Sequence, residues 1–284
     1  MSAEGIEIEQ MPDLQDPLFI AGFEGWGNAL NISKGMIDYL IDKLNAKMFG
    51  KLDPDLFYRF DENRPVVDVE DGLLKKMTPP GGFFYSVRKP SAGRDLIIFK
   101  AVEPSLAWFR FVNGVLSLCH RAGVKTIVSL GSMYDNVLHS DIIISALASS
   151  EEILARLKER NVTTVTYKGP SAVHSAIQVA AQQRGFECVS LWCHCPYYLQ
   201  GTTHFGLLSR LGAVLSSFGG FDLDTGELET VWSEVSAQIQ GLIDKSPELQ
   251  TMIDDLRKAK RKSSLDPAKK GDKVIHLEDF QKPK

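Results

Sequence analysis

The chain has 284 residues, of which 44% are hydrophobic and 24% are charged. This is the composition of an ordinary globular protein that is long enough to bury a large core. No apolar run approaches the roughly 20 residues that span a bilayer, and the acidic N-terminus lacks the hydrophobic stretch of a signal peptide. Four cysteines are too few for a disulfide scaffold in a chain of this length. We therefore expect a cytoplasmic protein that makes no membrane contact.

The net charge of −4 conceals an asymmetry along the chain. Residues 256–284 contain ten Lys or Arg and four Asp or Glu, which leaves a net charge of −10 on the rest. An acidic body argues against nucleic-acid binding by the main domain. We expect the last segment, residues 263–284, to be a disordered basic tail because it is rich in Ser, Pro, Lys and Gly.

The hydrophobic pattern predicts strands that alternate with helices. We expect residues 1–17 to lie on the surface before the first strand, and 73–80 to form a loop. The predicted strands are 18–21, 47–52, 57–60, 66–69, 83–87, 95–102, 125–130, 142–148, 163–167 and 188–193. The predicted helices are 28–44, 106–122, 150–160, 172–184, 203–217 and 228–262, the last with a break at Ser246-Pro247.

Two serines are predicted to cap helices. Ser105 precedes the helix at 106–122. Ser149 stands three residues before Glu152, which is the capping-box spacing.

This alternation predicts an α/β protein with a largely parallel central sheet flanked by helices. We expect an α/β core domain over residues 14–226 and C-terminal helices over 227–262, packed on or beside the core. In such a sheet the functional crevice lies at the carboxyl ends of the strands. Several polar loops follow predicted strands, and we expect them to meet there.

The stretch from residue 18 to residue 40 has the order strand, glycine loop, helix. Its loop contains Gly22, Gly25 and Gly27, and glycine permits positive φ and close approach of the backbone to a ligand. The loop is neither a phosphate loop, since no Gly-Lys-Ser/Thr follows, nor a dinucleotide fingerprint, since its glycine spacing is wrong. Glu24 would also repel a phosphate. A structural turn and a ligand-contact loop both remain open interpretations.

Other residues suggest chemistry only weakly. Ser132 lacks the Gly-x-Ser-x-Gly elbow of a hydrolase, and His139 near Asp141 could be either a base or an ordinary loop histidine. Cys193 and Cys195 would point away from His194 in a strand, so a shared metal ion is not expected. We expect no metal and no cofactor. The crevice candidates are Gly22, Glu24, Gly25, Gly27, Asn28, Glu103, Ser132, His139 and Tyr197.

An ordered set of motifs resembles the proteasome assembly chaperone two family, which includes uncharacterised bacterial and archaeal proteins. The resemblance covers about residues 16–258. It is carried by Gly-Phe-Glu-Gly-Trp-Gly-Asn at 22–28, Glu-Pro-Ser at 103–105, Leu-Gly-Ser-Met-Tyr at 130–134 with His139, Tyr167-x-Gly-Pro, Leu191-Trp192 and Pro196-Tyr197. The resemblance implies a phosphorylase/hydrolase-like α/β fold and a homo-oligomer, often a trimer.

The leading hypothesis is therefore a non-enzymatic oligomeric protein that resembles these chaperones and acts through protein–protein contacts. The alternative is a small-ligand-binding protein or an enzyme of the same fold that uses the crevice. Relatives that dock on proteasomes end in a hydrophobic–Tyr–X motif. Because this sequence ends Lys-Pro-Lys, we do not expect docking by that route.

Overall fold

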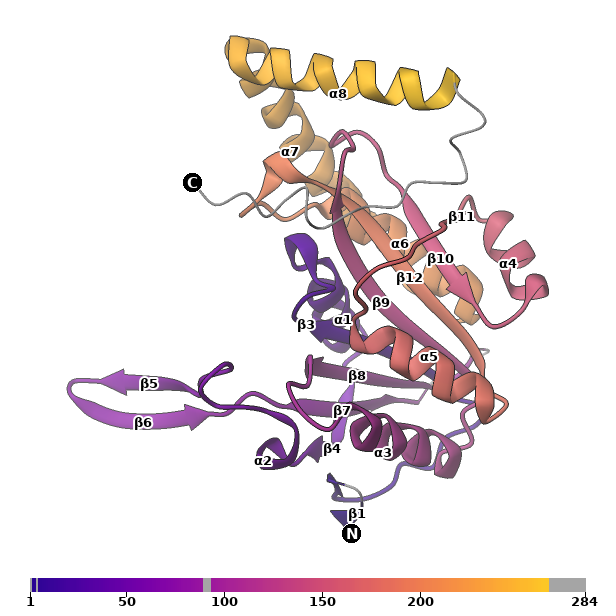
Figure 1. The fold of residues 1–284 in the computed structure, drawn as a ribbon. Coiled ribbons are helices and arrows are strands. Elements are labelled where there is room, and N and C mark those ends of the chain that lie inside the picture. Colours follow the sequence, from indigo (N-terminus) through magenta and orange to yellow (C-terminus); the bar gives the residue numbers. More distant parts are fainter. Residues whose placement is uncertain (1, 4, 89–92, 266–284) are drawn as a thin grey trace.

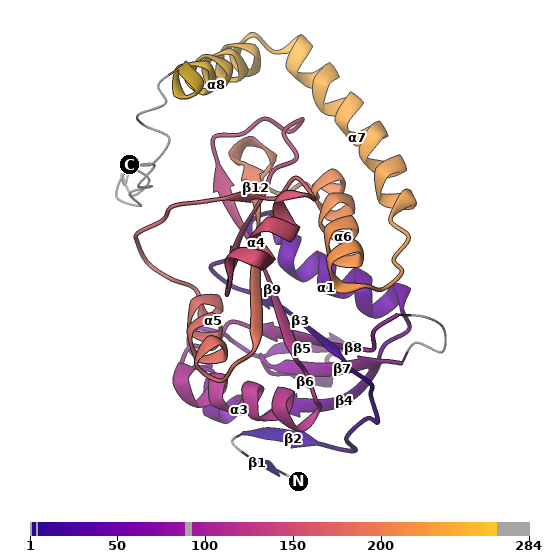
Figure 2. The ribbon, with the colours of Figure 1, turned by 90° about the vertical axis from the view of Figure 1, so that its right-hand side faces the viewer.

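The computed structural model describes residues 2–3, 5–88 and 93–265. They form a ten-stranded sheet in the order β1-β2-β4-β7-β8-β3-β9-β12-β10-β11, with helices on both faces (Figures 1 and 2). Its strands are β1 (Ser2–Ala3), β2 (Ile6–Ile8), β3 (Leu18–Glu24), β4 (Lys47–Leu52), β7 (Gly82–Val87), β8 (Leu96–Val102), β9 (Thr126–Asp135), β10 (Ile144–Ala148), β11 (Thr163–Thr164) and β12 (Glu187–Pro196).

Helices alternate with these strands along the chain. They are η1 (Ala29–Asn31), α1 (Ile32–Lys43), α2 (Pro54–Phe57), α3 (Trp108–Arg121), α4 (Glu151–Lys158), α5 (Val173–Gln183), η2 (Tyr197–Leu199), α6 (Phe205–Gly219), α7 (Gly226–Lys245) and α8 (Pro247–Leu265). None of the helices in the described part of the chain is long and apolar enough to cross a membrane.

The four central strands β8, β3, β9 and β12 are parallel, as expected for strands buried on both faces. Strands β7 and β10 flank them and pair antiparallel. The predicted α/β class with a mostly parallel centre is therefore confirmed. β3 shows why the sequence suits this place, because Leu18 and Ile20 point to one face while Phe19 and Phe23 point to the other, all of them buried.

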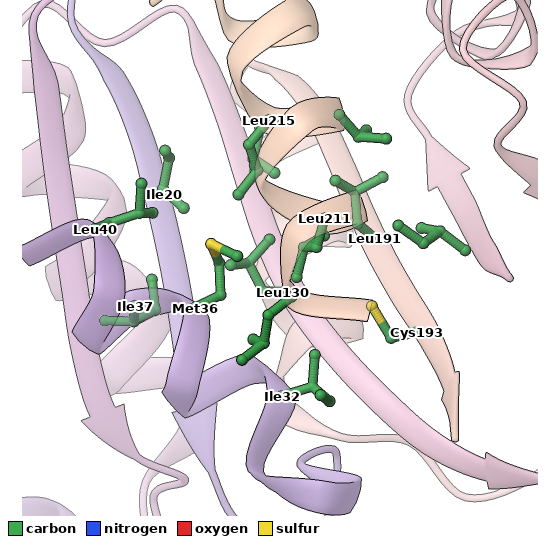
Figure 3. Packing of buried hydrophobic residues seen from close by; sticks show 14 of the residues in the cluster. Ile20, Ile32, Met36, Ile37, Leu40, Leu130, Leu191, Cys193, Leu211 and Leu215 are labelled. Carbon is green, nitrogen blue, oxygen red and sulfur yellow. The ribbon is translucent and has the colours of Figure 1, made fainter. Parts of the chain in front are cut away.

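The core on one face of the sheet is mainly aliphatic and lies beneath α1 and α6 (Figure 3). Met36 and Leu40 of α1 face Leu211 and Leu215 of α6 above the central strands. The apolar residues of α1 recur at helical spacing, which is why the sequence pattern predicted this helix correctly.

The core on the other face is aromatic and lies beneath α3 and α5. The rings of Phe84 and Phe99 stack with centroids 4.2 Å apart. Phe111 of α3 packs edge-on against Phe57 at 5.6 Å. These contacts fix the start of α3 near the carboxyl end of β8.

The C-terminal helices continue from the first core layer. Leu228 of α7 is buried in the aliphatic core, and Trp232 packs against it. The predicted break at Ser246-Pro247 is confirmed, since α7 ends at Lys245 and α8 begins at Pro247. The predicted disorder of the basic tail concerns residues that lie almost wholly outside the described part.

A two-stranded hairpin stands apart from the main sheet. Its strands are β5 (Val66–Glu70) and β6 (Leu73–Thr78), which pair with each other to form a separate sheet. The hairpin projects away from the body of the protein (Figure 1). We call residues 66–78 the arm. All of these residues are exposed.

Two predicted elements around the arm are wrong. Residues 57–60 do not form a strand, because Asp53 caps a helical turn at α2 by accepting from the backbone N–H of Asp55 at 3.1 Å. Residues 73–78 form a strand rather than a loop. β6 has neither a buried face nor a clear alternating pattern, so its sequence carried little signal.

The predicted caps differ by one or two residues. Ser150, not Ser149, caps α4 by accepting from the N–H of Ile153, while Ser149 accepts from the N–H of Cys188 at 2.9 Å. Ser105 does not cap α3, which begins after Ala107 in a left-handed conformation. Ser105 instead accepts from the Asn63 side chain at 2.8 Å, which ties two loops together.

The ends of the sheet also differ from the prediction. The surface segment expected at residues 1–17 contains β2, which pairs with β4 and buries Ile6. At the opposite edge the predicted strand at 163–167 is only two residues long. These edge strands are short, so their hydrophobic patterns were too brief to interpret.

Candidate functional site

The glycine loop leaves the carboxyl end of β3 and is packed tightly at its start. A Cβ atom on Gly22 would lie 2.4 Å from Ile37 of α1, so glycine lets this helix approach the strand. Gly25 has a φ of +145° and lies against Glu103, whose carboxylate would be 2.8 Å from an added Cβ. The absence of a side chain at Gly22 lets α1 pack against β3, and its absence at Gly25 lets Glu103 lie against the loop.

Glu103, just after β8, holds the crevice together. Its Oε2 accepts from the backbone N–H of Trp26 at 3.1 Å, and its Oε1 accepts from the N–H of Val173, the first residue of α5, at 2.8 Å. Its own N–H donates to the carbonyl of Glu24 at 2.6 Å. A carboxylate at a helix N-terminus is favourable because it meets unpaired N–H groups and the positive end of the helix dipole.

A hollow of about 410 Å³ opens beside this clamp. We call it the acidic hollow, because its lining contains three carboxylates and neither lysine nor arginine. It is lined by Glu24, Gly25, Glu62, Asn63, Val102, Glu103, Pro104, Ser105 and Trp108. Cations approach from outside the lining: Lys34 lies 3.9 Å from Glu24, and Arg59 lies 2.8 Å from Glu62.

The cations near the hollow are already shared with other carboxylates. Lys34 also contacts Asp38 at 2.8 Å, and Arg59 also contacts Asp61 at 2.8 Å. Burial acts to raise the pKa of Asp38, but hydrogen bonds from Lys100 and Lys34 outweigh burial and hold that pKa below its usual value. The neighbourhood of the hollow therefore keeps an excess of negative charge.

Exposed apolar side chains neighbour the lining residues of the acidic hollow along the chain. Trp26 is 51% exposed and Phe109 is 82% exposed. We define the apolar rim as Trp26, Phe60, Leu106 and Phe109, each of which lies within two residues of a lining residue. Trp26, Phe60 and Leu106 lie on three separate loops, and Phe109 lies in the first turn of α3. Exposed apolar side chains that gather in this way mark an interaction site.

Ser132 and Asn28 adjoin the glycine loop, and both make hydrogen bonds with nearby backbone groups. The Ser132 hydroxyl is fully buried and donates to the carbonyl of Ala29 at 2.8 Å, and its N–H donates to the carbonyl of Gly27 at 2.9 Å. The Asn28 side chain accepts from the N–H of Lys34 at 3.1 Å. Neither group is presented to a ligand in this arrangement.

His139 and Tyr197 take part in different contacts from those of the acidic hollow. The Nδ1 atom of His139 lies 2.9 Å from the Tyr198 hydroxyl, and the carbonyl of His139 accepts from His204 at 3.1 Å. Tyr197 stacks on Tyr134 with ring centroids 5.4 Å apart. Within the described residues, no hydrogen bond or ion pair connects His139 to Glu24 or Glu103.

The Cys193-His194-Cys195 sequence alternates across the sheet as expected. Both cysteines are buried in the aliphatic core, whereas His194 faces the other side. Among the described residues, no group of three or more His, Cys, Asp or Glu side chains is placed to hold a metal ion.

His194 instead belongs to a hydrogen-bonded chain that the sequence analysis missed. Its Nδ1 lies 2.8 Å from Asp135 and its Nε2 lies 2.8 Å from the Ser145 hydroxyl, which is the order of a Ser-His-Asp triad. Ser145 is fully buried, so its hydroxyl is not accessible to a substrate. The chain joins β9, β12 and β10. Asp135 could not be recognised because the predicted strand ended at residue 130.

His174 is a second buried residue that the sequence did not reveal. Its Nε2 donates to the carbonyl of Leu130 at 2.7 Å, while its Nδ1 is buried without a hydrogen-bond partner. Burial lowers the pKa of His174, which keeps the ring neutral. The ring packs between Phe23 and Trp192, with centroids 5.1 Å and 5.0 Å away.

The fold and the strand-end crevice define a three-layer α/β protein whose polar crevice residues mostly bind its own backbone. A family model assigns the class more narrowly: the chain matches the PAC2 family over residues 19–243 and belongs to that family. A comparison with curated proteins finds no significant match.

Solved structures of similar fold include a member of this family. A PAC2 family protein from Streptomyces avermitilis is 27% identical, with a TM-score of 0.71 over 84% of this chain and 100% of its own. A proteasome-assembly chaperone homologue from Mycobacterium tuberculosis is 24% identical, with a TM-score of 0.72 over 83% and 99%. The archaeal proteasome activator PbaB from Pyrococcus furiosus is 18% identical, with a TM-score of 0.63 over 84% and 97%.

Proposed function

We propose that this protein is a cytoplasmic, non-enzymatic homo-oligomer, such as a trimer, that acts through protein–protein contacts as an assembly chaperone. Membership of the PAC2 family supports the proposal, as do similar folds among a chaperone homologue and a proteasome activator. The partner class that follows is a proteasome subunit or a subunit of a comparable assembly. Neither nucleic acid nor a membrane is expected as a partner of the acidic core.

The observation that carries the proposal is the contrast between the polar residues and the apolar rim. The polar side-chain atoms of Glu103 and Ser132 bind the protein's own backbone, and Asn28 bonds to the backbone N–H of Lys34 and to the side chain of Asn31. Trp26 and Phe109 are instead left exposed beside the same loops. Polar groups that fix loops, together with exposed aromatic side chains, favour recognition of a protein surface over chemistry on a small substrate.

The test is co-expression with proteasome α-subunits from the same organism, followed by native gels and light scattering. We expect an oligomer that forms a complex with unassembled α-subunits and speeds their assembly. Replacing Phe109 by Ser should weaken that complex at least about tenfold, because an exposed aromatic anchor is lost. A monomer that neither binds the subunits nor changes their assembly would contradict the proposal.

The acidic hollow favours a second candidate function, which is binding of a small cationic or amine-bearing ligand. Its lining of Glu24, Glu62 and Glu103 and its volume of about 410 Å³ support this alternative. A thermal-shift screen with amines, amino acids, nucleosides and phosphate tests it. A genuine ligand should raise the melting temperature of the wild type but not that of Glu24→Ala or Glu62→Ala. If no compound shifts the wild type, this alternative fails.

A further inference from the structure

The tip of the arm is a tight turn built from Asp71 and Gly72. Glu70 pairs with Leu73 in the β5–β6 register, so only these two residues connect the strands. Asp71 has a φ of 50° and Gly72 a φ of 76°, which is the pattern of the type I′ turn that two-residue hairpins favour. An Asp–Gly sequence places the side-chain carboxyl carbon close to a backbone nitrogen that no neighbouring side chain shields. The arm therefore ends in a dipeptide that is prone to cyclise.

Few contacts hold this turn closed. Only the Val69–Leu74 and Glu70–Leu73 pairs lie between the turn and a β-bulge, where the register shifts after Asp68. Every residue of the arm is exposed, and the arm points away from the body (Figure 1). Within the described part of the chain, no hydrogen bond or ion pair joins the arm to the body. Because a two-stranded hairpin is marginally stable by itself in water, this turn opens far more often than the core unfolds.

The chain contains a second dipeptide of this reactive kind, and the fold protects it. Asp–Gly occurs once in the 284 residues, and Asn–Gly occurs once, at Asn113-Gly114. The second dipeptide lies inside α3, where Gly114 is buried and the Asn113 side chain accepts from Arg184 at 2.8 Å. A helical N–H points along the helix to the carbonyl four residues earlier, so the Gly114 nitrogen is not directed at the Asn113 side chain. Asparagine cyclises faster than aspartate in a flexible peptide, but here the fold leaves only Asp71 open to the reaction.

We propose that Asp71 is a site of spontaneous covalent modification, at which aspartate converts to isoaspartate. When the turn opens, the backbone nitrogen of Gly72 attacks the side-chain carboxyl carbon of Asp71. A C–N bond forms, and the N–H proton and the carboxyl hydroxyl leave as one water molecule, which gives a cyclic imide. Water then breaks the imide bond from the Gly72 nitrogen either to the side-chain carbon, which restores aspartate, or to the main-chain carbon, which gives isoaspartate. One water is released and one is consumed, so the conversion needs no other reactant.

The modification changes the geometry of the arm. In isoaspartate the main chain runs through the side-chain carbons, so the turn gains one backbone atom and keeps a free carboxylate beside it. The register of a hairpin is set by the length and type of its turn, so the longer turn no longer matches the Glu70–Leu73 pair. Val67 and Met77 lie opposite each other in the same register and are exposed. Conversion at Asp71 therefore disturbs the exposed apolar side chains of the arm and leaves the core packing unchanged.

Ageing of the full chain tests the site. The folded protein is kept in neutral buffer made with heavy-oxygen water, and samples are digested at intervals for peptide mapping by mass spectrometry. An isoaspartyl methyltransferase, used as a probe, measures the isoaspartate in each peptide. Heavy oxygen and isoaspartate should accumulate in the Asp71 peptide at least about tenfold faster than in the Asn113 peptide, because the arm opens more readily than α3. No gain at Asp71, or an equal gain at both sites, would overturn the inference.

Two variants keep the turn and move the rate in opposite directions. A Cβ atom on Gly72 would meet no atom within 4 Å, and asparagine tolerates a positive φ. Gly72→Asn should therefore preserve the turn but shield the attacking nitrogen, so isoaspartate at Asp71 should fall to background. Asp71→Asn also suits the turn, and it should form the imide faster than the wild type because ammonia is the leaving group. If Gly72→Asn ages like the wild type, the isoaspartate arises elsewhere and the site is wrong.

Unfolding should reverse the order of the two sites. In guanidinium chloride both dipeptides are flexible, so Asn113 should react faster than Asp71. The same order as in the folded protein would show that the fold does not protect Asn113, and it would overturn the inference. These measurements do not depend on an oligomer or on a proteasome subunit, so their outcome is independent of the proposed chaperone function.

Discussion

Both carboxylate oxygens of Glu103 are occupied by N–H groups from distant parts of the chain. Trp26 belongs to the glycine loop after β3, and Val173 begins α5 on the aromatic side of the sheet. One side chain therefore fixes two loops beside the acidic hollow. At the residue scale, the crevice is a structural junction whose apolar border is left exposed.

Replacing Glu103 by Ala should lower the free energy of unfolding by about 2–4 kcal/mol, because two charge-assisted hydrogen bonds are lost. Urea denaturation measures the change. Glu24→Ala is the control at the same hollow. Its carboxylate is part-exposed and lies 3.9 Å from Lys34, so its loss should cost less than about 1 kcal/mol. Equal effects of the two variants would contradict the junction role.

The burial of His204 leads us to expect that the folded protein loses stability in acid. Its Nδ1 accepts from the N–H of Leu207 at the start of α6, its Nε2 donates to the carbonyl of His139, and its ring stacks on Trp232 at 3.9 Å. Burial lowers the pKa of His204 from 6.5 to about 4. Between these values the unfolded chain binds a proton that the folded chain does not.

The stabilising contribution of neutral His204 is therefore complete above about pH 6.5 and is lost as the pH falls toward 4. The free energy of unfolding should drop by about 3 kcal/mol over this interval from this residue alone. Urea titrations at several pH values measure the slope. His204→Asn, which can still cap the helix, should show a shallower slope. Identical slopes for the variant and the wild type would disprove the assignment.

At the scale of elements, α1 depends on the close approach that Gly22 allows. The helix packs through Ile37 and Ser33 directly over β3, and the Ser33 hydroxyl donates to the carbonyl of Leu130 at 2.7 Å. This packing sets where the chain enters the sheet and therefore where the glycine loop begins. The loop is a consequence of helix packing as much as of any ligand.

Gly22→Ala should lower the free energy of unfolding by about 2–3 kcal/mol, because the new methyl group would lie 2.4 Å from Ile37 and the core would be overpacked. Gly35→Ala is the control on α1 itself. A Cβ atom there would be no closer than 3.6 Å to Leu208, so alanine should be neutral or stabilising by up to about 1 kcal/mol. Thermal unfolding of both variants decides whether this close packing is essential.

At the scale of the whole molecule, α7 connects the C-terminal helices to the core. Leu228 is buried in the aliphatic core, and Trp232 stacks on His204 and lies against Gly206 of α6. We propose that α7 unfolds together with the α/β core over 14–226 rather than as a separate unit.

Trp232→Ala should lower the free energy of unfolding by about 3 kcal/mol, because a large aromatic contact is removed next to His204. Trp232→Phe should cost less because a ring remains to stack. Helix content by circular dichroism and tryptophan fluorescence should report one coincident transition for the wild type. Two separate transitions would show that the C-terminal helices are energetically independent.

Much of the fold could be predicted because buried elements carry strong patterns. β4, at Lys47–Leu52, was predicted with its exact bounds, and the helix break before Pro247 was also found. Only the first strand of the arm was predicted, at 66–69, where β5 forms. β6 was missed because it has no buried face to impose alternation. Among the candidate site residues, Glu103 does contact the glycine loop, through the N–H of Trp26. His139 lies in a different group of contacts, because β9 runs beyond the predicted strand end to Asp135.

The sequence by itself determined the α/β class, the central strands and the family resemblance, because periodic burial and ordered loop motifs are local properties. Only the tertiary structure decided what the polar residues do, since hydrogen-bond partners such as Trp26 and Val173 lie far from Glu103 along the chain. It also placed Ser145, His194 and Asp135 in one chain of hydrogen bonds. The exposed face of the arm likewise became visible only once the packed core was known, because exposure is a property of the whole fold.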